Sequence, residues 1–100
     1  MTLRFEWEPK KAAANLSKHG VSFEEALTVF SDPLARIFDD EEHSDEEHSS
    51  DEPREIIIGQ STKRLLLLVC FTDRRTVIRL FSARPATSRE REDYEENVSS

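Results

Sequence analysis

An unbroken apolar run at residues 65–71 (LLLLVCF) constrains the fold of this chain more than any other feature. A strand with one solvated face alternates apolar and polar residues, whereas a continuous run indicates a central strand that is covered on both faces. The run is too short to cross a bilayer, which requires about 20 apolar residues. We therefore expect a sheet with packing on both sides, within a single domain that spans residues 1–100.

Four more strands are predicted, at residues 3–7, 34–38, 54–60 and 76–83, and the central strand extends to residue 72. The first strand is short and alternates Leu3, Phe5 and Trp7 with polar neighbours. Polar segments at 61–64 and 73–75 suit hairpin connections, which places the last four strands in one antiparallel sheet.

Helix signals lie between and after these strands. Pro9 suits the first turn of a helix and Gly20 its exit. A capping box, Ser22-x-x-Glu25, opens a second helix, and another at residues 87–90 opens a last helix. The predicted order is a short strand, two helices, a four-stranded antiparallel sheet and a C-terminal helix, which is an α+β fold.

The net charge of −7 hides an asymmetry along the chain. Residues 39–52 hold nine acids and no base, whereas residues 54–94 hold nine bases against five acids. The acidic segment contains DEEHS twice in tandem, which indicates a loop insertion at 39–53 rather than a solenoid repeat. The basic segment is compatible with a polyanionic partner, although the low pI argues against a non-specific nucleic-acid coat. We expect residues 95–100 to be a frayed tail.

Cations gather where the last strand meets the last helix. Alternation places Arg79 between apolar neighbours, where a guanidinium is costly without an anionic partner, and Arg84 follows five positions later. One interpretation is that both arginines stabilise phosphate charge, and the other is a structural ion pair with Glu90 or another acid. Regular alternation puts the two arginines on opposite faces unless Pro85 or a bulge turns the chain.

Other candidate residues also have a structural alternative. His19 suits acid–base work near neutral pH, yet beside Lys18 at a helix C-terminus it equally caps the helix dipole. Tyr94 is either a hydroxyl donor or a residue packed on the sheet, and Trp7 is either core or a ring on which a base stacks. The lone Cys70 is predicted to be a small buried residue, and the lack of a disulfide partner favours a reducing cytoplasm.

The histidines of the acidic segment, His43 and His48, raise the question of a metal site. A solvated loop explains the surrounding carboxylates more simply, because hard cations do not need histidine ligands. The sequence contains no P-loop, nucleophile elbow or zinc-spaced cysteine cluster, so no cofactor is expected. We also expect no signal peptide, since the N-terminus lacks a long apolar run.

The order and spacing of several short motifs resemble the BrnT family, toxins of type II toxin–antitoxin modules that are paired with BrnA antitoxins. The motifs are FEWEPKKA at 5–12, NLSKHGVSFEEA at 15–26, VFSDP at 29–33, HSSDEPR with a following IG at 48–59, and RLFSARPA with ERxxYE at 79–95. Glu8 stands where the family usually has Asp. The doubled DEEHS departs from the pattern, and it leaves His48 as the matching histidine and His43 as the extra one.

The resemblance implies a fold similar to RelE-type ribonucleases and a metal-independent endoribonuclease that inhibits growth by cutting RNA. Attack by the ribose 2′-hydroxyl requires a base, a leaving-group acid and cations on the phosphorane. In this scheme Arg79 and Arg84 stabilise the negative charge on the phosphorane. His19 or Lys18 transfers a proton, and Tyr94 assists. The residues assigned to substrate binding are Trp7, Lys11, Arg54, His48 and Arg91.

The resemblance also implies a partner, a BrnA-type antitoxin that is a dimeric DNA-binding protein of the ribbon-helix-helix type. Operator DNA is then contacted only through the complex, no membrane is involved, and a homodimer and a hetero-oligomer both stay open. Two non-enzymatic alternatives also stay open. One is an interaction domain whose basic face receives an acidic partner. The other is a decayed toxin that binds its antitoxin but cuts nothing, because nine carboxylates near the site repel RNA.

Overall fold

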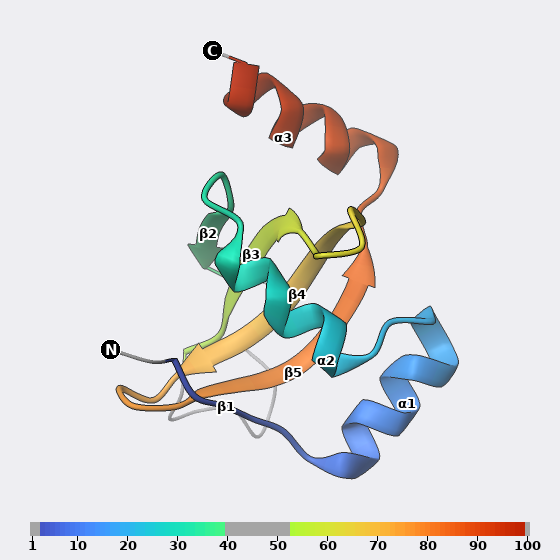
Figure 1. Ribbon diagram of the computed structural model, residues 1–100, viewed down its shortest axis with the longest axis vertical. Coiled ribbons are helices and arrows are strands. Elements are labelled where there is room, and N and C mark those ends of the chain that lie inside the picture. Colours follow the sequence, from blue (N-terminus) through green and yellow to red (C-terminus); the bar gives the residue numbers. More distant parts are fainter. Residues whose placement is uncertain (1–2, 40–52, 100) are drawn as a thin grey trace.

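The computed structural model describes residues 3–39 and 53–99, and the tandem DEEHS with His43 and His48 lies outside these ranges. Its elements are β1 (Phe5–Glu6), α1 (Pro9–His19), α2 (Phe23–Ala26), the 3₁₀ helix η1 (Leu27–Ser31), β2 (Arg36–Asp39), β3 (Glu55–Gln60), β4 (Leu66–Asp73), β5 (Ile78–Pro85) and α3 (Ser88–Ser99). The predicted α+β fold is confirmed (Figure 1).

One five-stranded sheet, in the order β1-β5-β4-β3-β2, forms the centre of the molecule. The last four strands are antiparallel neighbours in chain order, as the hairpin signals predict. The short N-terminal strand joins the same sheet as a fifth strand and runs parallel to β5, with Phe5 opposite Ile78 and Glu6 opposite Arg79. Sequence alternation alone shows that a segment is extended, but it does not identify a partner more than 70 residues away.

The central strand β4 is covered on both faces, which confirms the interpretation of the apolar run. On the first face Leu67, Val69 and Phe71 pack under α2 and η1. On the second face Leu66 and Leu68 form a smaller cluster with residues of β3 and α3. The second face therefore holds less apolar packing than the first and leaves room for polar side chains.

The predicted second helix is shorter and tighter than expected, because it is tied to the turn between β3 and β4. Ser22 Oγ accepts from Glu25 N at 3.0 Å, which is the first half of the capping box. The Glu25 carboxylate does not return to Ser22 and instead accepts from Ser61 Oγ at 2.8 Å in a buried position. Thr28 Oγ1 donates to Glu25 O and accepts from Thr62 N. These bonds accompany the change from α to 3₁₀ geometry at Leu27.

The first helix begins and ends, and the last helix begins, where the sequence predicts, but the last helix continues to Ser99, through most of the segment expected to be a frayed tail. Gly20 follows α1 with a φ of 72°, the left-handed conformation that glycine adopts most easily. At α3 the capping box is complete, since Thr87 N donates to Glu90 Oε1 at 2.8 Å and Glu90 N donates to Thr87 Oγ1 at 3.2 Å. α3 thereby starts close to the end of β5 and projects beyond the sheet (Figure 1).

Candidate functional site

A β-bulge in β5 brings the two predicted arginines to the same face of the sheet. The register against β4 shifts between Cys70 and Phe71, and the shift leaves Phe81 without a direct partner. On either side of it, Thr72 stands opposite Arg79 and Leu68 stands opposite Arg84. Directly opposed residues share a face, so both arginines lie on the second face. The bulge therefore gives the two arginines a shared face, on which they stand opposite Thr72 and Leu68, four positions apart along β4.

Arg79 is engaged by acidic residues of the N-terminal segment. Its Nη1 donates to Glu6 Oε2 at 2.9 Å, and its Nη2 lies 3.8 Å from Glu8 Oε2. The parallel pairing of β1 places Glu6 beside Arg79. Arg74 donates to the same Glu6 oxygen at 3.1 Å. The free chain therefore offsets the charge of Arg79 with its own carboxylates.

Arg84 is engaged more completely, by the first turn of α3. Its Nη1 and Nη2 each lie 2.9 Å from one carboxylate oxygen of Glu90, which is a bidentate pair. These hydrogen bonds from Arg84 lower the pKa of Glu90 to about 2, despite partial burial of the carboxylate. In the free chain Arg84 therefore forms the structural ion pair with Glu90, which was one of the two interpretations of the sequence.

Tyr94 anchors α3 to the sheet. Its ring packs against Ile58, Leu66 and Leu68, and its hydroxyl donates to Asp32 Oδ2 at 2.8 Å. Burial, followed by the bond to Asp32, raises the pKa of Tyr94 to about 12. In this structure its hydroxyl proton is therefore directed to Asp32, and Tyr94 occupies the packed position that the sequence offered as an alternative.

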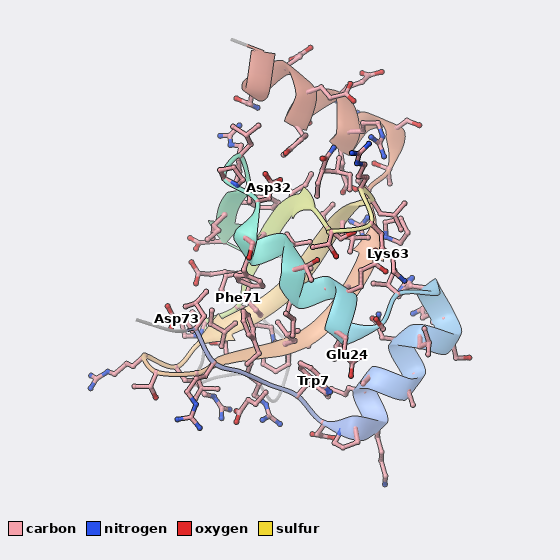
Figure 2. All side chains as sticks on the ribbon, in the orientation of Figure 1. Trp7, Glu24, Asp32, Lys63, Phe71 and Asp73 are labelled. Carbon is pink, nitrogen blue, oxygen red and sulfur yellow. The ribbon has the colours of Figure 1, made fainter. Side chains whose placement is uncertain are left out.

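Asp32 collects three donors at the junction of η1, β3 and α3 (Figure 2). Besides Tyr94, it accepts from Gln60 N at 2.8 Å and from Leu34 N at 2.9 Å. Burial by itself raises the pKa of Asp32, but these three hydrogen bonds outweigh it and the pKa is lowered. Gly59 makes room for this junction, because a Cβ there would stand 3.1 Å from Asp32 Oδ2 and closer still to Ala35.

Two cations on the basic surface have a different kind of partner. Lys11 Nζ lies 5.4 Å from the ring centroid of Phe81, and Arg54 Cζ lies 4.2 Å from it. Within residues 3–39 and 53–99, neither cation has a carboxylate within ion-pair distance, and Arg54 Nε is the one buried side-chain polar atom without a hydrogen-bond partner. This group, Lys11, Arg54 and Phe81, is called the Phe81 cluster below. It holds positive charge that described carboxylates do not offset.

The position of α1 beside β5 is fixed by a buried asparagine. β1 covers only the start of the outer edge of β5, and beyond it Asn15 completes the edge. Asn15 Nδ2 donates to Ala83 O at 2.9 Å and Asn15 Oδ1 accepts from Ala83 N at 2.9 Å, while Nδ2 also donates to Val21 O. This amide imitates the peptide group of a neighbouring strand. It holds α1 so that Lys11, one turn earlier, reaches Phe81.

The remaining predicted residues do not all gather at this place. Lys18 is exposed and His19 is half-buried in the last turn of α1, one turn beyond Asn15. Trp7 packs edge-to-face on Phe23 at 5.7 Å within the first-face core, as its structural alternative holds (Figure 2). Arg91 is exposed on α3 and lies 3.8 Å from Glu95. His48 lies outside the described residues.

Sequence reasoning missed Phe81 and Asn15 as parts of the site. Phe81 belongs to the apolar half of a predicted strand, and Asn15 was quoted only as the start of a motif. The available signal was the motif RLFSAR, in which strict alternation gives Arg79 and Arg84 opposite faces. A bulge at Phe81 brings both arginines to one face. Phe81 is also the residue whose ring contacts Lys11 and Arg54.

Metal-binding clusters and membrane-spanning helices are absent from the described part of the chain. It contains no group of three or more His, Cys, Asp or Glu side chains arranged to hold a metal ion. None of its helices is both long and apolar enough to span a membrane. Cys70 is buried on the second face, as predicted.

Known proteins resemble this chain in both sequence and fold. The sequence profile of one family, described as "Ribonuclease toxin, BrnT, of type II toxin-antitoxin system", matches residues 7–90. Among curated proteins no significant match is found. The crystal structure of the Brucella abortus ribonuclease toxin BrnT is similar to this one, with a TM-score of 0.62 and 22% sequence identity. The alignment covers 87% of this chain and 100% of that chain, and at this identity it establishes the shared fold.

Proposed function

We propose that this chain, which belongs to the BrnT family of ribonuclease toxins from type II toxin–antitoxin systems, cleaves RNA without a metal on the second face of its sheet. The observation that carries this proposal is the Phe81 cluster. A buried guanidinium N–H with no described acceptor, next to a second cation, is suited to receive a phosphate oxygen. An unpaired buried donor is unfavourable until a ligand binds, which favours an anion at this position.

The chemistry proposed for this surface is attack by the ribose 2′-hydroxyl on the adjacent phosphate. The reaction develops negative charge on the phosphorane, which Arg54 and Lys11 are placed to stabilise without a metal ion. Arg79 and Arg84 lie on the same face. They would help to stabilise this negative charge once they release Glu6 and Glu90. His19 or Lys18 is assigned the proton transfer.

The experiment is cleavage of RNA by the purified chain in the presence of EDTA. We expect cleavage that persists under chelation and falls at least ten-fold in the double variant Lys11→Gln/Arg54→Gln. The matched control is Lys63→Gln/Arg64→Gln, which removes the same charge from the exposed turn between β3 and β4. Cleavage that stops with EDTA and returns with Mg²⁺ would contradict metal independence. Equal losses in both double variants would contradict a role for the Phe81 cluster.

A specific observation favours a second candidate function. Three predicted catalytic side chains, Arg79, Arg84 and Tyr94, are each engaged by a carboxylate of the chain itself. A homologue that binds its antitoxin and cuts no RNA would keep such contacts permanently. Retained antitoxin binding with no cleavage of any RNA, at any metal concentration, would support this function over the first.

The antitoxin is the partner that a type II system implies. We infer that it is a BrnA-type protein of the ribbon-helix-helix class, that it neutralises the toxin, and that operator DNA is reached through the complex. Because all three statements rest on the family, co-purification of the two proteins followed by an operator-binding assay tests them together. Operator binding by the isolated toxin would contradict the last one.

A further inference from the structure

The strand at the sheet edge opposite β1 exposes apolar side chains. β2 is the outermost strand next to β3, and no described residue pairs with its outer side (Figure 1). Ile37 is 55% exposed and Phe38 is 47% exposed. Sheet edges in natural proteins are usually blunted by charges, prolines or cover, since an open edge is a template for another strand. The described part of the chain leaves this edge open.

A groove next to β2 extends this surface over the second face. It has a volume of about 370 Å³ and is lined by residues of β2, β3, β4 and α3, including Phe38, Ile58 and Tyr94. Phe38 stands opposite Ile56 and therefore faces the groove, whereas Ile37 stands opposite Ile57 and faces the first side. A strand added beyond β2 would place alternate side chains into the groove and onto the first face.

The charges at β2 specify what such a strand carries. Asp39 stands directly opposite Glu55, an unfavourable pairing of like charges, and neither has a cation within ion-pair distance in the described structure. A Lys or Arg opposite Asp39, on the added strand, would offset the repulsion between Asp39 and Glu55. At the other end of β2, Arg36 is exposed and also lacks a described carboxylate partner. Asp93 on the α3 side of the groove adds a further carboxylate.

We propose that the outer edge of β2 is the docking site for an extended segment of the antitoxin, which adds a sixth strand to the sheet. The segment carries a base opposite Asp39, apolar residues opposite Phe38 and Ile37, and an acid opposite Arg36. This inference rests on membership of a toxin–antitoxin family and on the outer edge of β2, whereas the proposed RNA site rests on Phe81 of β5, Lys11 of α1 and Arg54, which precedes β3. Main-chain hydrogen bonds supply affinity, and the four-residue pattern supplies specificity.

A second copy of this chain fits the same edge less well. A two-fold axis normal to the extended sheet pairs residues that lie on the same face. Arg36 and Asp39 lie on opposite faces, so an antiparallel pair of β2 strands cannot set one against the other. The like charges of Asp39 and Glu55 would also stay without a cation. The antitoxin is therefore the occupant that the charges favour.

The test is the affinity of the antitoxin encoded with this chain, measured by calorimetry against matched variants. Ile37→Ser/Phe38→Ser is expected to raise the Kd at least ten-fold. Its control, Leu3→Ser/Leu65→Ser, removes side chains of nearly equal exposure, 56% and 47%, and is expected to change the Kd less than two-fold. Asp39→Lys is likewise expected to raise the Kd at least ten-fold, with exposed Glu24→Lys as its control (Figure 2).

Hydrogen exchange gives a second readout that does not depend on any variant. The outward-pointing amides of β2, which are the alternate ones among residues 36–39, are expected to exchange at least ten-fold more slowly in the complex than in the free chain. Unchanged exchange, or equal affinities for the test and control variants, would overturn the proposal. A free-chain dimer that the double serine variant dissolves would overturn it in favour of self-association. If the purified wild-type chain does not cleave RNA, that result would contradict the proposed function and leave this inference unaffected.

Discussion

The two ends of the second face use the same kinds of side chain in opposite ways. At the α3 end, Arg84 and Tyr94 are each matched to a carboxylate, Glu90 and Asp32. At the other end, Arg54 and Lys11 meet an aromatic ring and no described carboxylate. A cation over a ring keeps most of its capacity to bind an anion, whereas a bidentate ion pair must first be broken. We therefore propose that the α3 end contributes mainly to stability and that the Phe81 cluster binds the ligand.

The largest effect is expected from Tyr94→Ala at the anchored end. Removing a buried aromatic ring leaves a cavity, and deletions of this type cost about 3–5 kcal/mol of unfolding free energy. Urea denaturation measures the loss. Phe81→Ala, at a half-buried ring, should cost clearly less stability while reducing RNA cleavage. Equal destabilisation by the two variants would remove the distinction between the two ends.

Arg54→Gln should lower RNA cleavage about ten-fold, equivalent to about 1.4 kcal/mol of transition-state stabilisation. Its stability should change by less than about 1 kcal/mol, because the substitution removes only the interaction of a cation with a ring. Single-turnover rates at saturating RNA separate this loss of rate from weaker binding. The paired end offers the contrast, since Glu90→Gln removes the carboxylate that holds Arg84 and should leave cleavage equal or higher.

Acid should weaken the α3 end selectively. The folded pKa of Glu90 is about 2, below its ordinary value of 4.5, so its stabilising contribution is present above about pH 4.5 and is lost as pH falls toward 2. The pair is partly exposed, and solvent screening limits the contribution to about 1 kcal/mol. Denaturation of wild type and Glu90→Gln between pH 6 and pH 3 should show curves that converge at the acid end. Parallel curves would contradict the assignment.

The smallest effect is expected from Lys11→Gln, about three-fold in RNA cleavage. Lys11 is exposed and lies farther from the Phe81 ring than Arg54, so its charge is better screened by solvent. Raising the salt concentration should reduce the difference between Lys11→Gln and wild type. A loss larger than that of Arg54→Gln would reverse the order of importance within the Phe81 cluster.

Local patterns were sufficient to predict most of the fold. The buried β4, the exit of α1 at Gly20 and the capping box at Thr87 depend on residues that are close in sequence. The partner of β1, the bulge at Phe81 and the edge contact of Asn15 depend on register across the sheet, which local periodicity does not contain. Glu25 shows the same limit, because Ser61 competes with the predicted cap for its carboxylate.

In the candidate site, too, the sequence predicted which residues take part but not which partners they contact. Residue type and the family resemblance were enough to select Lys11 and Arg54, but the ring that joins them follows from a bulge between two strands. For Arg84 the sequence offered an ion pair with Glu90 as the alternative to a phosphate, and only the geometry shows that pair as bidentate. Predictions of residue identity were therefore stronger than predictions of which partner each residue has.

The amide of Asn15 also bears on when this protein becomes active during its synthesis. Its contact with Ala83 joins residues 68 positions apart, and the contact of Glu6 with Arg79 spans 73. Lys11 and Arg54 likewise reach a residue in the last fifth of the chain. These parts can therefore meet only after residues up to Ala83 have left the ribosome, and a chain stopped at residue 75 should neither bind nor cut RNA. The pairing of β1 and α1 with β5 thus makes the proposed RNA cleavage depend on the prior synthesis of residues 79–83.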